Sequence, residues 1–198
     1  MTLKEKISQI IKYAKTHKNI QQQFNDRGYT GLSTNGNGFF ATNLWTVVPE
    51  FDYEKLTSLT KLCYTNKIVT EVYLKNTHNI TNFTQAFYYC SKLQRIETLD
   101  VTSATKFSSA FNQCSELRHI RISGVLSADF DIKQSPNLDL DSAKNIILHL
   151  KDFTGSEEAN THAIYFHENV WVLLDADGLT SPNGNSWRDY VYDLCWNT

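Results

Sequence analysis

Residues 69–92 read VTEVYLKNTHNITNFTQAFYYCSK, and residues 93–116 read LQRIETLDVTSATKFSSAFNQCSE. When the second stretch is shifted back by 24 residues, seven apolar or small positions coincide without a gap. The coinciding pairs are Val69 and Leu93, Val72 and Ile96, Ile80 and Ala104, Phe83 and Phe107, Ala86 and Ala110, Phe87 and Phe111, and Cys90 and Cys114. Repetition at a fixed period of this length indicates an array of stacked units.

Each unit is predicted to contain a strand, a polar turn and a short helix. Residues 69–74 and 93–99 are rich in β-branched side chains, which favour a strand. Phe83, Ala86 and Phe87 recur at i, i+3 and i+4, which predicts one face of a short helix. One unit cannot bury its own apolar face, so neighbouring units are expected to stack. The expected core of the stack is Phe83, Ala86, Phe87, Cys90, Leu93, Ile96, Phe107, Ala110, Phe111, Cys114, Leu117 and Ile120.

The stretches AFYYCSKLQRI (residues 86–96) and AFNQCSELRHI (residues 110–120) carry a family resemblance. They resemble BspA-type leucine-rich repeats, whose units look like A-F-x-x-C-x-x-L-x-x-I, and the resemblance covers about residues 60–140. It implies an α/β fold: a short leucine-rich-repeat-like solenoid of 24-residue strand–turn–helix units, with an N-terminal helix and a C-terminal cap. Similar repeats occur in bacterial and protist surface proteins and in phage or prophage tail-associated proteins of gut bacteria. The resemblance therefore implies recognition and adhesion, without enzymatic activity or a cofactor.

The setting expected from these features is a virion. The first residues, MTLKEKISQ, lack the apolar stretch of a signal peptide, and the array is short for a surface adhesin. Both features favour a tail or fibre protein of a phage or prophage that binds a protein or cell-surface partner. The alternative is a protein-interaction module of the bacterial cytoplasm.

The chain is expected to have four segments: an N-terminal helix at 1–28, a linker and cap at 29–58, the repeats at 59–138 and a C-terminal cap at 139–198. Leu3, Ile7, Ile10 and Ala14 alternate four and three residues apart, which is the seam of a coiled coil. A homo-oligomer, a trimer in a fibre, is therefore expected through residues 3–26. The alternative is an amphipathic helix packed on the chain's own domain.

The C-terminal cap is expected to hold three helices and a strand. The first helix would begin at Asp141 or Ser142 and run to about Lys151. A strand at residues 163–166 and a helix starting at Val170 would follow, and Asn185 or Ser186 would cap a last helix.

Tyrosine and arginine are enriched where proteins bind one another, so exposed residues of these types in the repeats are the candidate contacts. With one histidine, the candidates are Tyr73, Tyr88, Tyr89, Arg95, Arg118, His119 and Arg121. The alternative for each of them is an ordinary surface position.

A catalytic thiol, a disulfide and two metal sites are conceivable from the sequence, but the residue pattern favours a structural role for each of these residues. Cys90 with His78 or His119 would make a thiol nucleophile, but Cys90 and Cys114 hold equivalent repeat positions, so packing explains both. A disulfide between these two cysteines was the less favoured state. Asp175-x-Asp177-Gly lacks the spacing of a calcium loop, and a His162–His167 pair would lie on opposite faces of a strand.

A carbohydrate-binding or carbohydrate-active protein is the third hypothesis. Trp171, Trp187 and Trp196 would stack on sugars, and the acidic candidates are Asp175, Asp177, Asp189 and Asp193. Two other classes are disfavoured by composition. The net charge of −2 argues against nucleic acid, and the longest apolar run is far shorter than the ~20 residues that span a membrane.

Overall fold

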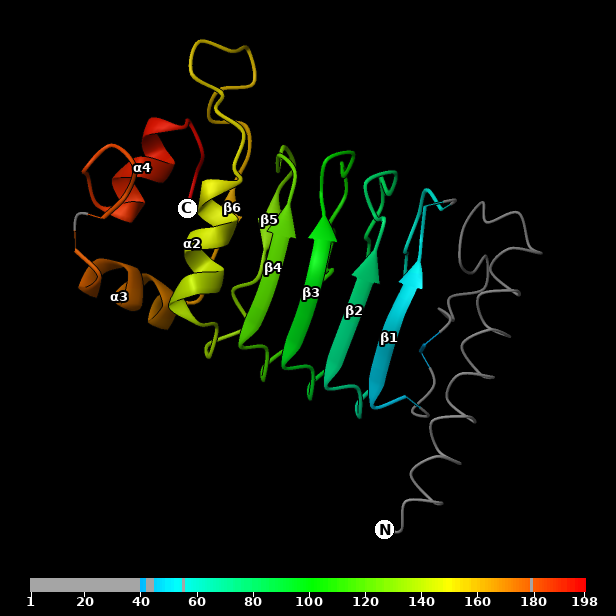
Figure 1. Ribbon diagram of the computed structural model, residues 1–198. Coiled ribbons are helices and arrows are strands. Elements are labelled where there is room, and N and C mark those ends of the chain that lie inside the picture. Colours follow the sequence, from blue (N-terminus) through cyan, green and yellow to red (C-terminus); the bar gives the residue numbers. More distant parts are fainter. Residues whose placement is uncertain (1–39, 42–44, 55, 179) are drawn as a thin grey trace.

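The structure is a computed structural model that describes residues 40–41, 45–54, 56–178 and 180–198 (Figure 1). The predicted helix at 1–28 and the oligomer contact through residues 3–26 lie outside the described residues. The strands are β1 (Val47–Asp52), β2 (Glu71–Lys75), β3 (Arg95–Asp100), β4 (His119–Ser123), β5 (Phe130–Asp131) and β6 (Ile164–Tyr165). The helices are α2 (Leu140–Leu148), α3 (Glu168–Ala176) and α4 (Trp187–Asp193).

The first four strands form one parallel sheet in the order β1-β2-β3-β4, which curls as an open half-barrel (Figure 1). Val48, Val72, Ile96 and Ile120 are successive Cα partners across this sheet, so the sequence period of 24 residues is also its strand register. Successive side chains of a strand point to opposite faces. In β2, Val72 is therefore buried while Tyr73 is only half-buried.

The prediction of a helix in each unit is wrong, because the residues after each strand form tight turns. Gln85 and Tyr89 have φ angles of 56° and 59°, in the left-handed region that ends an α-helix. The backbone hydrogen bonds inside the segment span three residues, as from Ala86 N to Phe83 O and from Cys90 N to Phe87 O. The same pair of left-handed residues recurs one unit later at Ser109 and Gln113.

The remaining amides of these turns bond to the following unit rather than to their own. Gln85 N donates to Ser108 O at 2.9 Å and Phe87 N donates to Ala110 O at 2.9 Å. A helix would have used these donors internally. The predicted leucine-rich-repeat-like solenoid of strand–turn–helix units is therefore wrong. Over the described residues the fold is α/β, but it is a curled parallel half-barrel sheet with three short helices, and those helices gather beyond β4 (Figure 1).

The side chains expected in the repeat core are all buried, and the most exposed of them, Phe107, is only 4% accessible. Their aromatic rings stack between units: Phe83 lies 5.1 Å from Phe107, and Phe87 lies 5.6 Å from Phe111, measured between ring centroids. Equivalent residues therefore touch across the 24-residue period, which keeps the core continuous from one unit to the next.

Helix α2 follows the sheet and covers the outer edge of β4. Its cap is Asp139, which accepts a hydrogen bond from Ser142 N, rather than the expected Asp141 or Ser142. Ser142 Oγ accepts the β4 amide of Ile120 at 3.0 Å, and Asn145 Oδ1 accepts that of Ile122 at 2.8 Å. These side chains satisfy strand amides that a further strand would otherwise bind.

The rest of the C-terminal region packs against α2 and the end of the sheet. Strands β5 and β6 form a separate parallel pair, and α3 and α4 follow β6. Ser186, one of the two expected caps, caps α4 by accepting Asp189 N. Among the helices that the structure describes, none has the length and apolar character needed to cross a membrane.

Candidate binding surface

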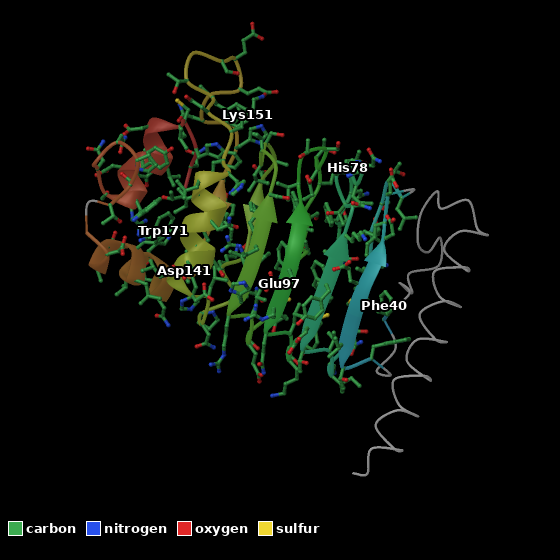
Figure 2. The ribbon with its side chains drawn as sticks, viewed as in Figure 1. Phe40, His78, Glu97, Asp141, Lys151 and Trp171 are labelled. Atoms are coloured by element: carbon green, nitrogen blue, oxygen red, sulfur yellow. The ribbon has the colours of Figure 1, made fainter. Side chains whose placement is uncertain are left out.

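The outward face of β2, β3 and β4 carries two rows of polar side chains. Glu71, Arg95 and His119 are Cα partners in the first row. Tyr73 and Glu97 are partners in the second row, and Arg121 holds the equivalent position of β4. Because alternate residues of each strand point inward, these six form one continuous surface, with Glu97 near its centre (Figure 2).

The side chains of this surface hold one another in place. Tyr73 Oη donates a 2.5 Å hydrogen bond to Glu71 Oε2, which raises the pKa of Tyr73 and keeps the phenol protonated. Arg95 pairs with Glu97 on the same strand. Such bonds reduce the conformational freedom that these side chains would lose on binding a partner.

His119 connects this surface to the cap of α2. Its Nε2 atom lies 3.4 Å from Glu97 Oε1, and its Nδ1 atom lies 3.2 Å from Asp139 Oδ2. One imidazole therefore lies between two carboxylates from different elements. Asp139 also caps α2, so the position of His119 depends on the start of that helix.

The structure brings four of the seven candidate contact residues together on the sheet: Tyr73, Arg95, His119 and Arg121. Arg118 is exposed immediately before β4. Tyr88 and Tyr89 lie in the turns instead, where Tyr88 stacks on Tyr64 at 5.1 Å between ring centroids.

Two acidic residues of the surface, Glu71 and Glu97, and Asp139 beside His119 are not among the candidates predicted from the sequence, because those were chosen mainly as tyrosine and arginine. The alternation of polar and apolar residues in β2 and β3 contains the missing signal, since Glu71 and Glu97 share a face with Tyr73 and Arg95. The contribution of Asp139 comes from the packing of α2 on β4, which no local pattern shows.

Cys90 and Cys114, the repeat cysteines, lack the exposure and the lowered pKa of a nucleophile. Cys90 is buried, its Sγ donates to Cys63 O at 3.0 Å, and burial raises the pKa of its thiol to about 12. Cys114 is equally buried and donates to Phe87 O at 3.1 Å. All four cysteines are free, so the considered disulfide between Cys90 and Cys114 is not formed.

The Asp and His residues that the sequence offers as metal ligands make contacts with other side chains or cap helices. Asp177 accepts hydrogen bonds from Lys144 Nζ at 2.6 Å and from Trp187 Nε1 at 3.1 Å, so its carboxylate is already paired. His162 faces Asp129, whereas His167 caps α3. Within the part of the chain that the structure describes, no three His, Cys, Asp or Glu side chains are placed to hold a metal ion.

The three tryptophans proposed for sugar stacking belong to the core. Trp171 and Trp187 are each 3% exposed and Trp196 is fully buried. Trp196 Nε1 donates to Lys151 O at 2.8 Å, and the Arg188 guanidinium lies 4.3 Å from the centroid of the Trp171 ring. A sugar has no access to the face of a ring buried in this way.

Comparison with known proteins yields no relative: no protein family, curated protein or solved structure matches this chain. Arguments about its function therefore depend on the geometry of its own residues.

Proposed function

We propose that this chain is a non-enzymatic recognition module that binds a protein partner through the outward face of β2, β3 and β4. The observation that carries the proposal is the pair of rows on that face, in which acidic, basic and aromatic side chains alternate in fixed register. Arginine and tyrosine are the residue types most frequent at binding hot spots, and here Arg95 holds the centre of the first row while Tyr73 and Arg121 hold the two ends of the second.

The balance of charge on this face favours a protein over a nucleic acid. Glu71 and Glu97 offset Arg95 and Arg121, and Lys92 pairs with Glu116 at the rim. A polyanion is attracted by a surface of one sign, whereas alternating charge selects a partner with the complementary pattern. The partner expected here is therefore a folded protein with mixed charge on its contact surface.

The narrower setting, a phage or prophage virion or a cell surface, stays a prediction that depends on features of the sequence: the A-F-x-x-C repeats, the first residues and the short array. Peptides of this chain in purified particles would support it. Their absence from particles of a strain that expresses the chain would contradict it.

The test of the proposal is a comparison of captured proteins between matched variants. Full-length chain is immobilised beside an Arg95→Ala/Arg121→Ala variant, and retained proteins from host or particle extracts are quantified by mass spectrometry. We expect a partner whose affinity falls at least tenfold in the variant, because both arginines of the surface are removed.

Arg188→Ala is the matched control, because Arg188 lies in α4 on the Trp171 ring and away from the sheet face. A partner retained equally by all three proteins would assign binding to another surface. The proposal would be contradicted if no captured protein bound the Arg95→Ala/Arg121→Ala variant more weakly than the natural chain. Equal melting temperatures of the variants would exclude unfolding as the cause of lost binding.

A further inference from the structure

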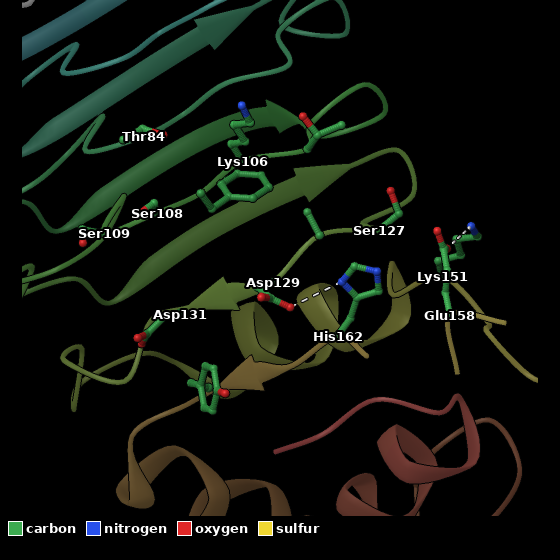
Figure 3. A pocket seen from close by; sticks show the side chains of 14 residues that line it. Thr84, Lys106, Ser108, Ser109, Ser127, Asp129, Asp131, Lys151, Glu158 and His162 are labelled. Atoms are coloured by element: carbon green, nitrogen blue, oxygen red, sulfur yellow. Dashed lines mark hydrogen bonds and ion pairs between the residues drawn. The ribbon is translucent and has the colours of Figure 1, made fainter. Parts of the chain in front are cut away.

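A second feature, separate from the sheet face, is a hollow of about 730 Å³ where the last turns meet β5 and β6 (Figure 3). Its volume lies in the range of small-molecule sites. The lining residues are Thr84, Thr105, Lys106, Phe107, Ser108, Ser109, Ser127, Ala128, Asp129, Asp131, Lys151, Glu158, His162 and Tyr165.

The hollow forms where the 24-residue period ends. Ser135 stands where a repeat cysteine would, but it follows Cys114 after 21 residues instead of 24, and its hydroxyl donates to Cys114 O, whereas Cys114 donates to Phe87 O. In this shortened unit the ring of Phe130 packs on Phe107 and on Phe111, each at 5.0 Å between centroids. The residues on either side of Phe130 are Asp129 and Asp131, and both line the hollow.

Hydroxyl groups dominate one wall. Thr84 and Ser108 hold equivalent positions of successive units, and Thr105, Ser109 and Ser127 add three more hydroxyls. A hydroxyl both donates and accepts hydrogen bonds, so this wall complements a ligand whose own groups do the same. Lys106, also on this wall, makes no ion pair with any residue that the structure describes (Figure 3).

The opposite wall holds charges that are already paired. Asp129 Oδ1 accepts Ala163 N at 3.0 Å and lies 3.4 Å from His162 Nδ1, while the Asp129 side chain stays 68% exposed. Lys133 pairs with Asp131 at 3.0 Å, and Lys151 pairs with Glu158 at 3.4 Å (Figure 3). The open carboxylate oxygens can accept hydrogen bonds from ligand hydroxyls, and the pairing of the cations with carboxylates leaves no excess positive charge on this wall for an anionic ligand.

One aromatic ring completes the site. Tyr165 of β6 is 41% exposed at the edge of the hollow, unlike the buried tryptophans. Lys133 Nζ lies 5.2 Å from the centroid of its ring, so a sugar ring is expected on the face opposite this lysine. The C–H faces of a sugar ring pack on an exposed aromatic ring, and its hydroxyls require the polar partners described above. We propose that this hollow binds a neutral saccharide, with Tyr165 under the sugar ring and Asp129 and the Ser/Thr wall bonded to its hydroxyls.

The test uses the full chain and four neutral trisaccharides: maltotriose, cellotriose, mannotriose and triacetylchitotriose. Amide NMR shifts are followed up to about 10 mM sugar, which covers the weak binding expected of a small polar ligand. At least one sugar is expected to shift the amides of residues 105–109, 127–131 and 162–165. Tyr165→Ala is expected to weaken that binding about tenfold, through loss of ring contact.

Tyr192→Ala is the matched control, because Tyr192 of α4 is similarly exposed, at 48%, and does not line the hollow. Asp129→Asn is the second test variant if Tyr165→Ala lowers the melting temperature. No shift with any of the four sugars, shifts confined to other residues, or equal binding by the Tyr165 and Tyr192 variants would each overturn the proposal. The Arg95→Ala/Arg121→Ala variant should bind sugar normally, so this site and the sheet face are tested independently.

Discussion

Four buried side chains occupy one column through the array, and each donates a hydrogen bond to the unit before it. Each donates to a backbone carbonyl of the preceding unit at 2.9–3.1 Å: Asn66 to Phe40, Cys90 to Cys63, Cys114 to Phe87 and Ser135 to Cys114. The column thus requires a small hydrogen-bond donor rather than a thiol as such. This explains why cysteine recurs in a chain whose cysteines form no disulfide.

The burial of the thiols predicts their reactivity. Cys63, Cys90 and Cys114 are fully buried with raised pKa values, whereas Cys195 is partly exposed. At about pH 8 we expect a thiol reagent to modify one cysteine per native chain, and all four after unfolding in urea. Mass spectrometry should place the native label on Cys195. Rapid native labelling of Cys90 would show that its column is open.

Asp177 predicts a dependence of stability on pH. Hydrogen bonds from Lys144, Thr180 and Trp187 lower the pKa of Asp177 to about 2. Asp177 ends α3, Lys144 lies in α2 and Trp187 in α4, so all three helices meet at this carboxylate. A lowered folded-state pKa stabilises the fold above the unfolded value of about 3.9, and this contribution is lost as pH falls toward about 2.

Urea midpoints of the natural chain and Asp177→Asn, measured between about pH 2 and 5, check this expectation. The natural chain should be more stable above about pH 4, and the difference should shrink as the pH decreases. A difference that is independent of pH would mean that the charge of Asp177 does not contribute.

At the scale of elements, apolar spacing identified the correct core residues but the wrong backbone conformation. Phe83, Ala86 and Phe87 are buried as a helix would bury them, yet Gln85 and Tyr89 are left-handed and direct amides to the next unit. Glycine or asparagine marks such a conformation in sequence, and glutamine and tyrosine do not. The stacking of units, which is a long-range effect, selects the turns.

The C-terminal helices were predictable because their signals are local. Ser186 precedes α4 and caps it, the observed cap of α2, Asp139, lies two to three residues before the expected Asp141 or Ser142, and α3 starts two residues before the expected Val170. The binding surface was only partly predictable. Tyr73 and Arg95 follow from residue type, but their shared face depends on strand register and the contribution of Asp139 on helix docking.

Among the glycines that the structure describes, Gly124, immediately after β4, is the position where an added methyl group meets the closest contacts. Its φ angle is 82°, and a Cβ atom would lie 2.2 Å from Thr102 Oγ1 and 2.8 Å from Thr102 N. Gly124→Ala is expected to lower the free energy of unfolding by about 1–3 kcal/mol, because it combines backbone strain with a clash against backbone.

Gly155→Ala is the matched control, since Gly155 also has a positive φ, 72°, but its Cβ would have no atom within 4 Å. Urea unfolding should show a clearly smaller loss for this variant. Equal losses would mean that backbone conformation alone, and not the approach of Thr102, determines the cost.

At the scale of the whole molecule, one cluster of buried side chains runs from Phe40 to Trp196. Sheet, turns and C-terminal helices share this cluster, so the described residues are expected to unfold together. Fluorescence and circular dichroism should report the same urea midpoint. Phe87→Ala and Trp196→Ala should each lower the midpoint measured by both probes to the same extent. Two separated transitions would show that the helices fold independently of the sheet.

The predicted trimer through residues 3–26 stays a prediction that solution mass can test. Light scattering on the full chain and on a chain that starts at Asn37 should give a trimer and a monomer, if the first residues form the expected coiled coil. Two monomers would contradict the prediction and leave the recognition proposal unchanged.

The paired left-handed residues also determine how such a chain can change in length. The amides of Gln85 and Tyr89 donate to carbonyls of the next unit, so each unit helps to determine the conformation of its neighbour. A whole additional unit of 24 residues, inserted between residues 92 and 93, would continue every column and ring stack. A single inserted residue would shift the columns and leave the outward amides without acceptors. Insertion of whole units would therefore enlarge the binding face without loss of these hydrogen bonds.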